Sequence, residues 1–230
     1  MPRVIGVDLL REMAIALPEG WSPARRRLRR EAIELMRSED LVEAAYSYNI
    51  VPLEGSAAES LHVGGETLYA PRMLPVSGEL TALGCGVTTL GPRIEVRVRK
   101  LFGEKRASLA MAMDGLANEM LIALDRRIQD RMLAECYRRR LTMAGELRAG
   151  DPGLDISAQA AVLRLANAQS IGVTINGSHL MTPLKSTSLV LGIGRDLPAV
   201  SWSRCDTCPS SKTCNFGHRP KAAVPNHSGV

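Results

Sequence analysis

Three of the five cysteines lie within ten residues of one another, close to the carboxyl end of the sequence. Cys205 and Cys208 form a Cys-x2-Cys turn, and Cys214 and His218 follow it. Such a turn lets two thiolates bind the same soft metal, and a cluster this dense is typical of coordination. The spacing therefore predicts that Cys205, Cys208 and Cys214 bind a metal ion or an iron–sulfur cluster.

The fourth ligand decides the identity of this centre. His218 would complete a Cys3His zinc site, whereas a distant cysteine or an open position would suit an iron–sulfur cluster. Cys85, in the apolar, glycine-flanked stretch 83–87, is the plausible distant donor, although a lone cysteine commonly packs as a small hydrophobe. Cys136 lies in a helical pattern and is interpreted as a residue that fills the core or a groove. The alternative for the whole cluster is a disordered tail with unliganded thiols.

Composition limits the class of protein. With 230 residues and 45% hydrophobic content, the chain can bury a sizeable core. Charged residues interrupt the apolar stretch 4–17, and no run of 18 apolar residues exists, so we expect no membrane span, no secretory signal and a cytoplasmic location. Clustered cysteines in odd number favour metal or redox chemistry over a disulfide framework.

The net charge of +5 comes largely from arginines in two blocks, 25–30 and 138–140. We do not expect nucleic acid as a partner, because aromatic residues, at 3%, are too few for a stacking platform. Charge runs are usually solvated surface. We therefore interpret the blocks as exposed helix faces or as a dock for an acidic protein.

Local patterns predict mixed helices and strands. Ser22 as cap and Pro23 at the first helical position begin a helix over 23–47. Apolar residues at three- and four-residue steps predict one long helix over 107–141, or two with a kink near Gly115. Further elements are expected as strands at 61–63, 67–69, 80–89, 171–175 and 187–193, a loop at 145–153 and a helix at 156–168.

Helices and strands follow one another without a repeated βα unit. This order predicts an α+β fold in which an antiparallel sheet is flanked by long helices. We expect residues 1–202 to form that domain and residues 203–230 to form a cysteine-rich, metal-binding appendage.

Three segments, 85–95, 159–174 and 179–188, resemble the activation (reactivation) domain of cobalamin-dependent methionine synthase and its free-standing relatives. The last contains Met-Thr-Pro-Leu-Lys-Ser at 181–186, which resembles the Met-x-Pro-x-Lys-Ser stretch of stand-alone members. Many of those members also end in a cysteine cluster. The resemblance covers about residues 60–219. It implies the fold of that domain, binding of S-adenosylmethionine, and cooperation with a corrinoid protein whose cob(II)alamin is remethylated after one-electron reduction.

The same resemblance implies ligand-binding residues. The family pairs the methionyl carboxylate with an arginine before a Pro-Gly-Tyr turn, where the guanidinium fork suits a carboxylate. Here Arg148 precedes the turn that contains Gly153, one residue further from the glycine than in the family, and Leu154 replaces the tyrosine. Glu95 matches the acidic residue after Thr-x-Gly and is expected to bind the amino group. The alternatives are an ordinary surface arginine and a carboxylate in the first turn of a helix. Lys185 is expected, with Ser186, to shape a turn.

Two functions of different classes follow. The first is an activator that assists remethylation of cob(II)alamin on a partner protein, using S-adenosylmethionine, an electron from an iron–sulfur cluster, or both, with a separate electron donor protein as a possible second partner. The second is a non-catalytic binding module whose tail is stapled by zinc. A cluster colours the protein brown, whereas zinc is silent. We expect the corrinoid partner to dock on the sheet and the turn at 181–186.

Overall fold

The computed structural model describes residues 3–6, 8–13 and 20–198. Its helices are α1 (Leu10–Met13), α2 (Pro23–Ser38), α3 (Arg93–Gly103), α4 (Ala107–Arg138) and α5 (Gln159–Leu165). Its strands are β1 (Arg3–Gly6), β2 (Ala45–Ala57), β3 (Ser60–Val63), β4 (Glu66–Tyr69), β5 (Glu79–Thr89), β6 (Thr142–Leu147), β7 (Thr174–Ile175), β8 (Met181–Thr182) and β9 (Ser186–Arg195). Short 3-10 turns occupy Pro71–Met73, Ile156–Ala158 and Ala168–Ile171.

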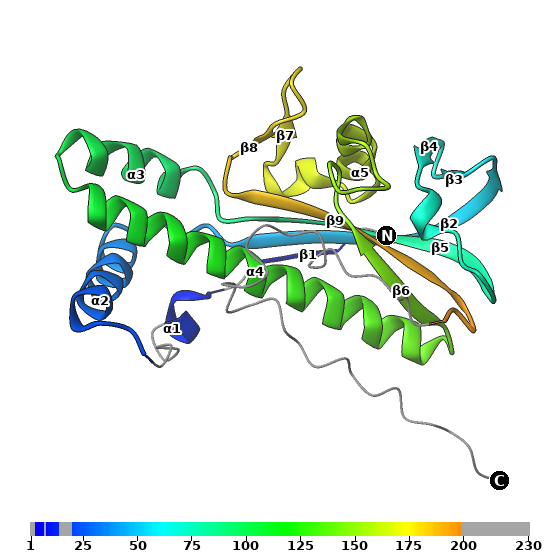
Figure 1. Cartoon of the computed structure of the whole chain (residues 1–230), viewed down its shortest axis with the longest axis horizontal. Coiled ribbons are helices and arrows are strands. Elements are labelled where there is room, and N and C mark those ends of the chain that lie inside the picture. The colour runs from blue at the N-terminus through cyan, green and yellow to red at the C-terminus, as the bar shows by residue number, and fades with distance from the viewer. Residues whose placement is uncertain (1–2, 7, 14–19, 199–230) are drawn as a thin grey trace, which may run out of the picture.

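An antiparallel sheet forms the centre of the described fold. Its strands lie in the order β4-β3-β2-β5-β9-β6, with β1 also paired to β2, and a separate small sheet joins β7 to β8. The long helix α4 runs along one face, and α5 with the β7–β8 hairpin lies on the other (Figure 1). The predicted α+β fold with an antiparallel sheet flanked by long helices is therefore confirmed.

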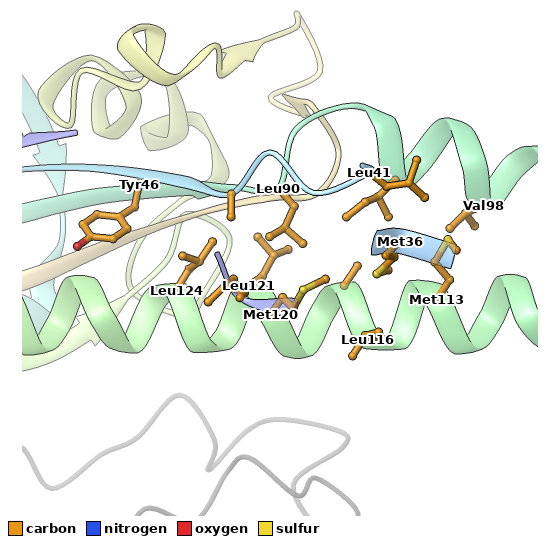
Figure 2. Close-up of a cluster of buried hydrophobic side chains, with 14 of the residues drawn as sticks. Met36, Leu41, Tyr46, Leu90, Val98, Met113, Leu116, Met120, Leu121 and Leu124 are labelled. Atoms are coloured by element: carbon orange, nitrogen blue, oxygen red, sulfur yellow. The ribbon is translucent and has the colours of Figure 1, made fainter. Parts of the chain in front are cut away.

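The face covered by α4 carries the larger hydrophobic core. α4 also packs against α2 and α3, and Figure 2 shows Met113, Met120 and Leu124 of α4 among side chains from those elements and β2. Gly84 and Gly86 of β5 let the helix approach the sheet closely. A Cβ at Gly84 would lie 2.6 Å from the sulfur of Met132, and one at Gly86 would lie 3.0 Å from Ile128.

Among the described residues, only α4 is long and apolar enough to span a membrane, by length and composition alone; 44% of its apolar window is buried within this fold.

The second core lies between the sheet and α5. Leu83, Cys85 and Val87 point into it from β5, and Val162 enters from α5. Cys85 is fully buried there, and burial raises the pKa of its thiol to about 12. Its setting is that of a small hydrophobe and disfavours the thiolate a metal requires. Cys136, at the end of α4, is also buried, as predicted.

The predicted helix over 23–47 begins correctly but ends too late. Ser22 caps α2 by accepting a hydrogen bond from the Arg25 amide, at 3.3 Å. The helix stops at Ser38, and Asp40 follows in the left-handed conformation, with φ of 49°. The chain then enters β2, which was not predicted. Leu41 and Val42 fit the helical spacing but lie in the connection between α2 and β2, where they pack against the larger core.

Three other expectations need correction or refinement. The predicted loop 145–153 begins inside β6, where the register shifts between Ala144 and Glu146 and Gly145 adopts a positive φ. The predicted strand 171–175 is a strand only at its end, in β7; Ile171 closes a 3-10 turn, and Gly172 follows it with φ of 72°. α3 was not predicted as an element. The long helix over 107–141 is one continuous helix, α4, which ends at Arg138.

Candidate functional site

Residues 183–187 connect β8 to β9 and include the first two residues of β9; this stretch, called the β8–β9 segment below, lies beside both predicted ligand-binding side chains. The amide of Leu184 donates to Oε2 of Glu95, at 2.7 Å, and Oγ1 of Thr187 accepts from Nη1 of Arg148, at 2.9 Å. Glu95 comes from the first turn of α3, and Arg148 directly follows β6. Glu95 and Arg148 are 53 positions apart in the sequence, yet the residues they contact, Leu184 and Thr187, are only three positions apart.

A buried carboxylate on α4 organises the Arg148 end of this segment. Asp125 is 2% exposed. It accepts hydrogen bonds from the Thr88 hydroxyl at 3.0 Å, from the Thr187 hydroxyl at 3.0 Å and from Nη2 of Arg148 at 2.6 Å. Burial raises the pKa of Asp125, and the charge and hydrogen bonds of Arg148 oppose that rise. The Asp125 carboxylate therefore contacts β5 through Thr88, β9 through Thr187, and Arg148, which directly follows β6.

Arg148 is fully engaged in this network. Its Nη2 also approaches Oε1 of Glu146 at 3.1 Å, and its Nε lies 3.3 Å from the same oxygen. The side chain is 18% exposed. Burial by itself lowers the pKa of Arg148, but Asp125 and Glu146 more than offset it, so the net pKa is raised. The alternative of an ordinary surface arginine is wrong, because Arg148 forms a mostly buried ion pair with Asp125.

The turn after Arg148 is closed by its own hydrogen bonds. The amide of Asp151 donates to the Arg148 carbonyl at 2.8 Å, and the Arg148 amide donates back to Oδ2 of Asp151 at 2.9 Å. Gly153 has φ of 96°, and a Cβ there would lie 2.8 Å from Cγ of Arg72. Leu154 is 1% exposed and belongs to the α5-face core. Glycine is required by the backbone, and the leucine that replaces tyrosine packs in the interior.

Lys185 and Ser186 shape the turn into β9, as predicted. Nζ of Lys185 lies 2.7 Å from Asp114 and 2.8 Å from Oδ1 of Asn118, both on α4. The Ser186 hydroxyl donates to Oγ1 of Thr89 at 2.9 Å. Both side chains therefore fix the segment against its neighbours.

Sequence reasoning did not identify Asp125. A signal was present, because Asp125 lies four residues after Leu121 and three before Ile128, on the buried stripe of α4. An acid on such a stripe is seldom buried without a cationic or hydrogen-bonding partner. The stripe does not reveal that the partner is Arg148.

The predicted metal ligands Cys205, Cys208 and Cys214, with His218, lie outside the described residues. Within residues 3–6, 8–13 and 20–198, no group of three or more His, Cys, Asp or Glu side chains could hold a metal ion.

No family model matches this sequence, and no curated protein matches it. Among solved structures, the crystal structure of the MetH reactivation domain bound to AdoHcy is similar, with a TM-score of 0.58. The likeness covers 87% of this chain and 80% of that chain, at 11% sequence identity. The two chains share a fold. At 11% identity the likeness shows the architecture alone and does not assign roles to individual residues.

Proposed function

We propose that this chain is an activator of a corrinoid-dependent methyltransferase system that assists reductive remethylation of cob(II)alamin on a partner protein. The observation that carries the proposal is the likeness of fold to the MetH reactivation domain, whose crystal structure is bound to AdoHcy. One electron reduces the partner's cobalt, and the methyl group then passes from S-adenosylmethionine, which leaves AdoHcy. The chain's own part is to hold the methyl donor and the partner together, in the cytoplasm.

The methyl donor is proposed to bind at the segment between β8 and β9. Its methionyl carboxylate would pair with Arg148 and its ammonium with Glu95, with Gly153 alongside. Glu95 is half-buried and uses one oxygen for the Leu184 amide. Arg148 already pairs with Asp125 and Glu146, so ligand binding would exchange one anionic partner of the guanidinium for another.

The division into a domain over 1–202 and an appendage over 203–230 is part of the proposal. We infer that Cys205, Cys208 and Cys214 hold an iron–sulfur cluster that supplies or relays the electron, because thiolates at this spacing suit one. A protein prepared without oxygen should be brown and contain iron and sulfide, and serine at any one of the three positions should bleach it. One equivalent of zinc without iron would instead favour a Cys3His site with His218 and a zinc-stapled binding module.

The partner is proposed to be a corrinoid-binding protein that docks over the β8–β9 segment, with an electron donor protein as a possible second partner. Leu180 directly precedes β8 and Leu184 lies in the β8–β9 segment; their side chains are 55% and 58% exposed. They offer the apolar contact that a shallow dock for a bulky cofactor needs. The exposed arginines at 25–27, 30 and 138–140 would steer an acidic partner, and association should then weaken as salt rises. Arg29, expected with its block on an exposed face, is instead buried and pairs with Glu119.

The proposed function is tested by the visible spectrum of a candidate cob(II)alamin protein mixed with this chain, a reductant and S-adenosylmethionine. We expect conversion to methylcobalamin only when this chain and the methyl donor are both present. If candidate proteins neither convert nor show a shifted cob(II)alamin band on mixing, the activator function is wrong.

A further inference from the structure

Two carboxylates pair with Arg148, and they differ in burial and in distance. Oδ2 of Asp125 lies 2.6 Å from Nη2 of Arg148, whereas Oε1 of Glu146 lies 3.1 Å from the same nitrogen and 3.3 Å from Nε. The side chain of Asp125 is 3% exposed, and that of Glu146 is 25% exposed. Hydrogen bonds between charged groups are usually about 2.7–2.9 Å long. Asp125 therefore forms the closer and more enclosed of the two pairs.

The difference in burial decides which carboxylate can leave Arg148. A buried ion pair is costly to break, because each charge would be left uncompensated in a poorly solvated place. A partly exposed carboxylate regains hydration when it leaves, and an exposed ion pair contributes little. Asp125 therefore stays with Arg148, and Glu146 is the partner that another carboxylate can replace.

A bulge in β6 brings Glu146 to the same face as Arg148. The register of β6 against β9 shifts at Gly145, which has φ of 69°. Met143, before the bulge, packs against the core on the α4 face. Unbroken alternation from Met143 would turn Glu146 toward α5, because a slip of one residue reverses the faces. After the bulge Leu147 packs in the α5-face core, and the flanking Glu146 and Arg148 face α4.

Gln129 of α4 fixes the orientation of the Glu146 carboxylate. Its Nε2 donates to Oε2 of Glu146 at 3.0 Å, while Oε1 accepts from both Nε and Nη2 of Arg148. Glu146 thus places a single oxygen against the Nε–Nη2 edge of the guanidinium. A carboxylate that sets both oxygens on that edge would form the stronger, bidentate pair. The edge is therefore occupied by a weaker partner than it can accept.

We propose that Glu146 is a stand-in for the ligand carboxylate. It occupies the Nε–Nη2 edge of Arg148 until the methionyl carboxylate of S-adenosylmethionine replaces it, while Asp125 remains paired. This inference rests on the function proposed for the β8–β9 segment. Because Glu146 competes with the ligand for Arg148, neutralising it should increase the fraction of protein that is ready to bind, and so the apparent affinity.

Simple attraction between charges predicts the opposite result. S-adenosylmethionine has a net positive charge, because its sulfonium and ammonium outnumber its one carboxylate, so loss of a nearby acid should weaken its binding. Decarboxylated S-adenosylmethionine keeps both cations but has no carboxylate with which to replace Glu146. The two ligands therefore separate competition for Arg148 from general electrostatic attraction.

The test is calorimetric titration of the full chain and of Glu146→Gln with both ligands. Glu146→Gln keeps the size of the side chain and a carbonyl oxygen, but it removes the charge that holds Arg148. We expect it to bind S-adenosylmethionine at least about threefold more tightly than the parent does. Its affinity for the decarboxylated ligand should be unchanged or lower. Glu79→Gln, an exposed acid on β5 that pairs with Arg195, is the matched control and should leave both affinities unchanged.

The outcomes separate this inference from the proposed function. If the parent binds S-adenosylmethionine but Glu146→Gln binds it no more tightly, or gains equally for both ligands, the stand-in role is wrong and the proposed site is retained. Binding by Glu146→Gln alone would support the stand-in role. If neither protein binds S-adenosylmethionine, the proposed methyl-donor site is wrong, and the role of Glu146 is rejected with it.

Discussion

The two faces of the sheet are held by different chemistry. The α4 face buries charge: Asp125 pairs with Arg148, and ten residues further along the same helix Glu135 accepts a hydrogen bond from the Tyr48 hydroxyl at 2.6 Å. A buried ion pair adds little net stability, because desolvation offsets the attraction between the charges. The α4 face therefore contains groups that folding alone does not require.

On the α5 face, the buried polar contacts are neutral. Gln159 and the Ser188 hydroxyl exchange hydrogen bonds at 3.0 and 3.2 Å, and the Ser47 hydroxyl donates to the Ala166 carbonyl at 2.6 Å. The fully buried thiol of Cys85 lies among them in an apolar core. The α5 face supports the sheet. The α4 face carries the Arg148 guanidinium beside the β8–β9 segment, where we propose that S-adenosylmethionine binds.

The largest expected effect comes from Arg148→Ala, which leaves Asp125 buried without its counterion. We expect the free energy of unfolding to fall by about 3–5 kcal/mol at neutral pH, measured by urea denaturation. Burial raises the pKa of Asp125, and loss of Arg148 should raise it further. The folded variant then takes up a proton at a higher pH than the unfolded chain, so its deficit should shrink as pH falls through that pKa.

A paired substitution separates charge from packing. Asp125→Leu combined with Arg148→Met removes both charges and should recover most of the loss, since apolar replacement of a buried ion pair is often neutral or stabilising. A deficit in Arg148→Ala that is equal at all pH values, or a double variant no better than the single one, would show that Arg148 stabilises the fold by packing and not as a counterion.

A smaller effect is expected from Gly84→Ala, which tests the close approach of α4 to the sheet. The new Cβ would lie 2.6 Å from the sulfur of Met132 and 3.1 Å from Cδ1 of Ile193. Overpacking of this kind lowers the free energy of unfolding by about 1–3 kcal/mol. The midpoint of thermal or urea unfolding should fall accordingly. Gly55→Ala, on β2 where a Cβ meets nothing within 4 Å, should change stability by less than about 0.5 kcal/mol.

The smallest effect is expected on the α5 face. Gln159→Leu with Ser188→Ala removes both members of a neutral hydrogen-bonded pair, and such replacements are nearly neutral. The double variant should lie within about 1 kcal/mol of the parent in urea denaturation. A loss as large as that of Arg148→Ala would abolish the contrast between the two faces.

Local signals predicted the elements that depend on local interactions. The cap at Ser22 and the unbroken apolar spacing of α4 are visible in the sequence, and both predictions are confirmed. β2 was missed because its pairing is non-local, and because Pro52 interrupts its strand pattern. In the described register, β1 pairs with residues 45–48 and β3 with residues 53–57, so Pro52 lies between these partners and needs no amide donor on that edge.

The candidate site was only partly accessible from sequence. Glu95 and Arg148 were selected through a resemblance to a family, and their assignment as ligand-binding residues stays a prediction. Their shared position beside the β8–β9 segment requires strand pairings that no local pattern reveals. Asp125 is marked by its place on a buried stripe, but its partner lies 23 residues later, beyond the end of α4. A pattern can indicate that an acid is buried without indicating what compensates its charge.

The central claim is that the β8–β9 segment binds S-adenosylmethionine, and calorimetric titration of the full chain tests it most directly. Glu95→Gln is the sharpest variant, because the amide oxygen can still accept from Leu184 while the charge is lost. We expect the parent to bind and Glu95→Gln to lose about 1.5–3 kcal/mol of binding free energy. Glu79→Gln, an exposed acid on β5 that pairs with Arg195 at 3.4 Å, should bind as the parent does. No binding by the parent, or equal affinity in Glu95→Gln, would contradict the account.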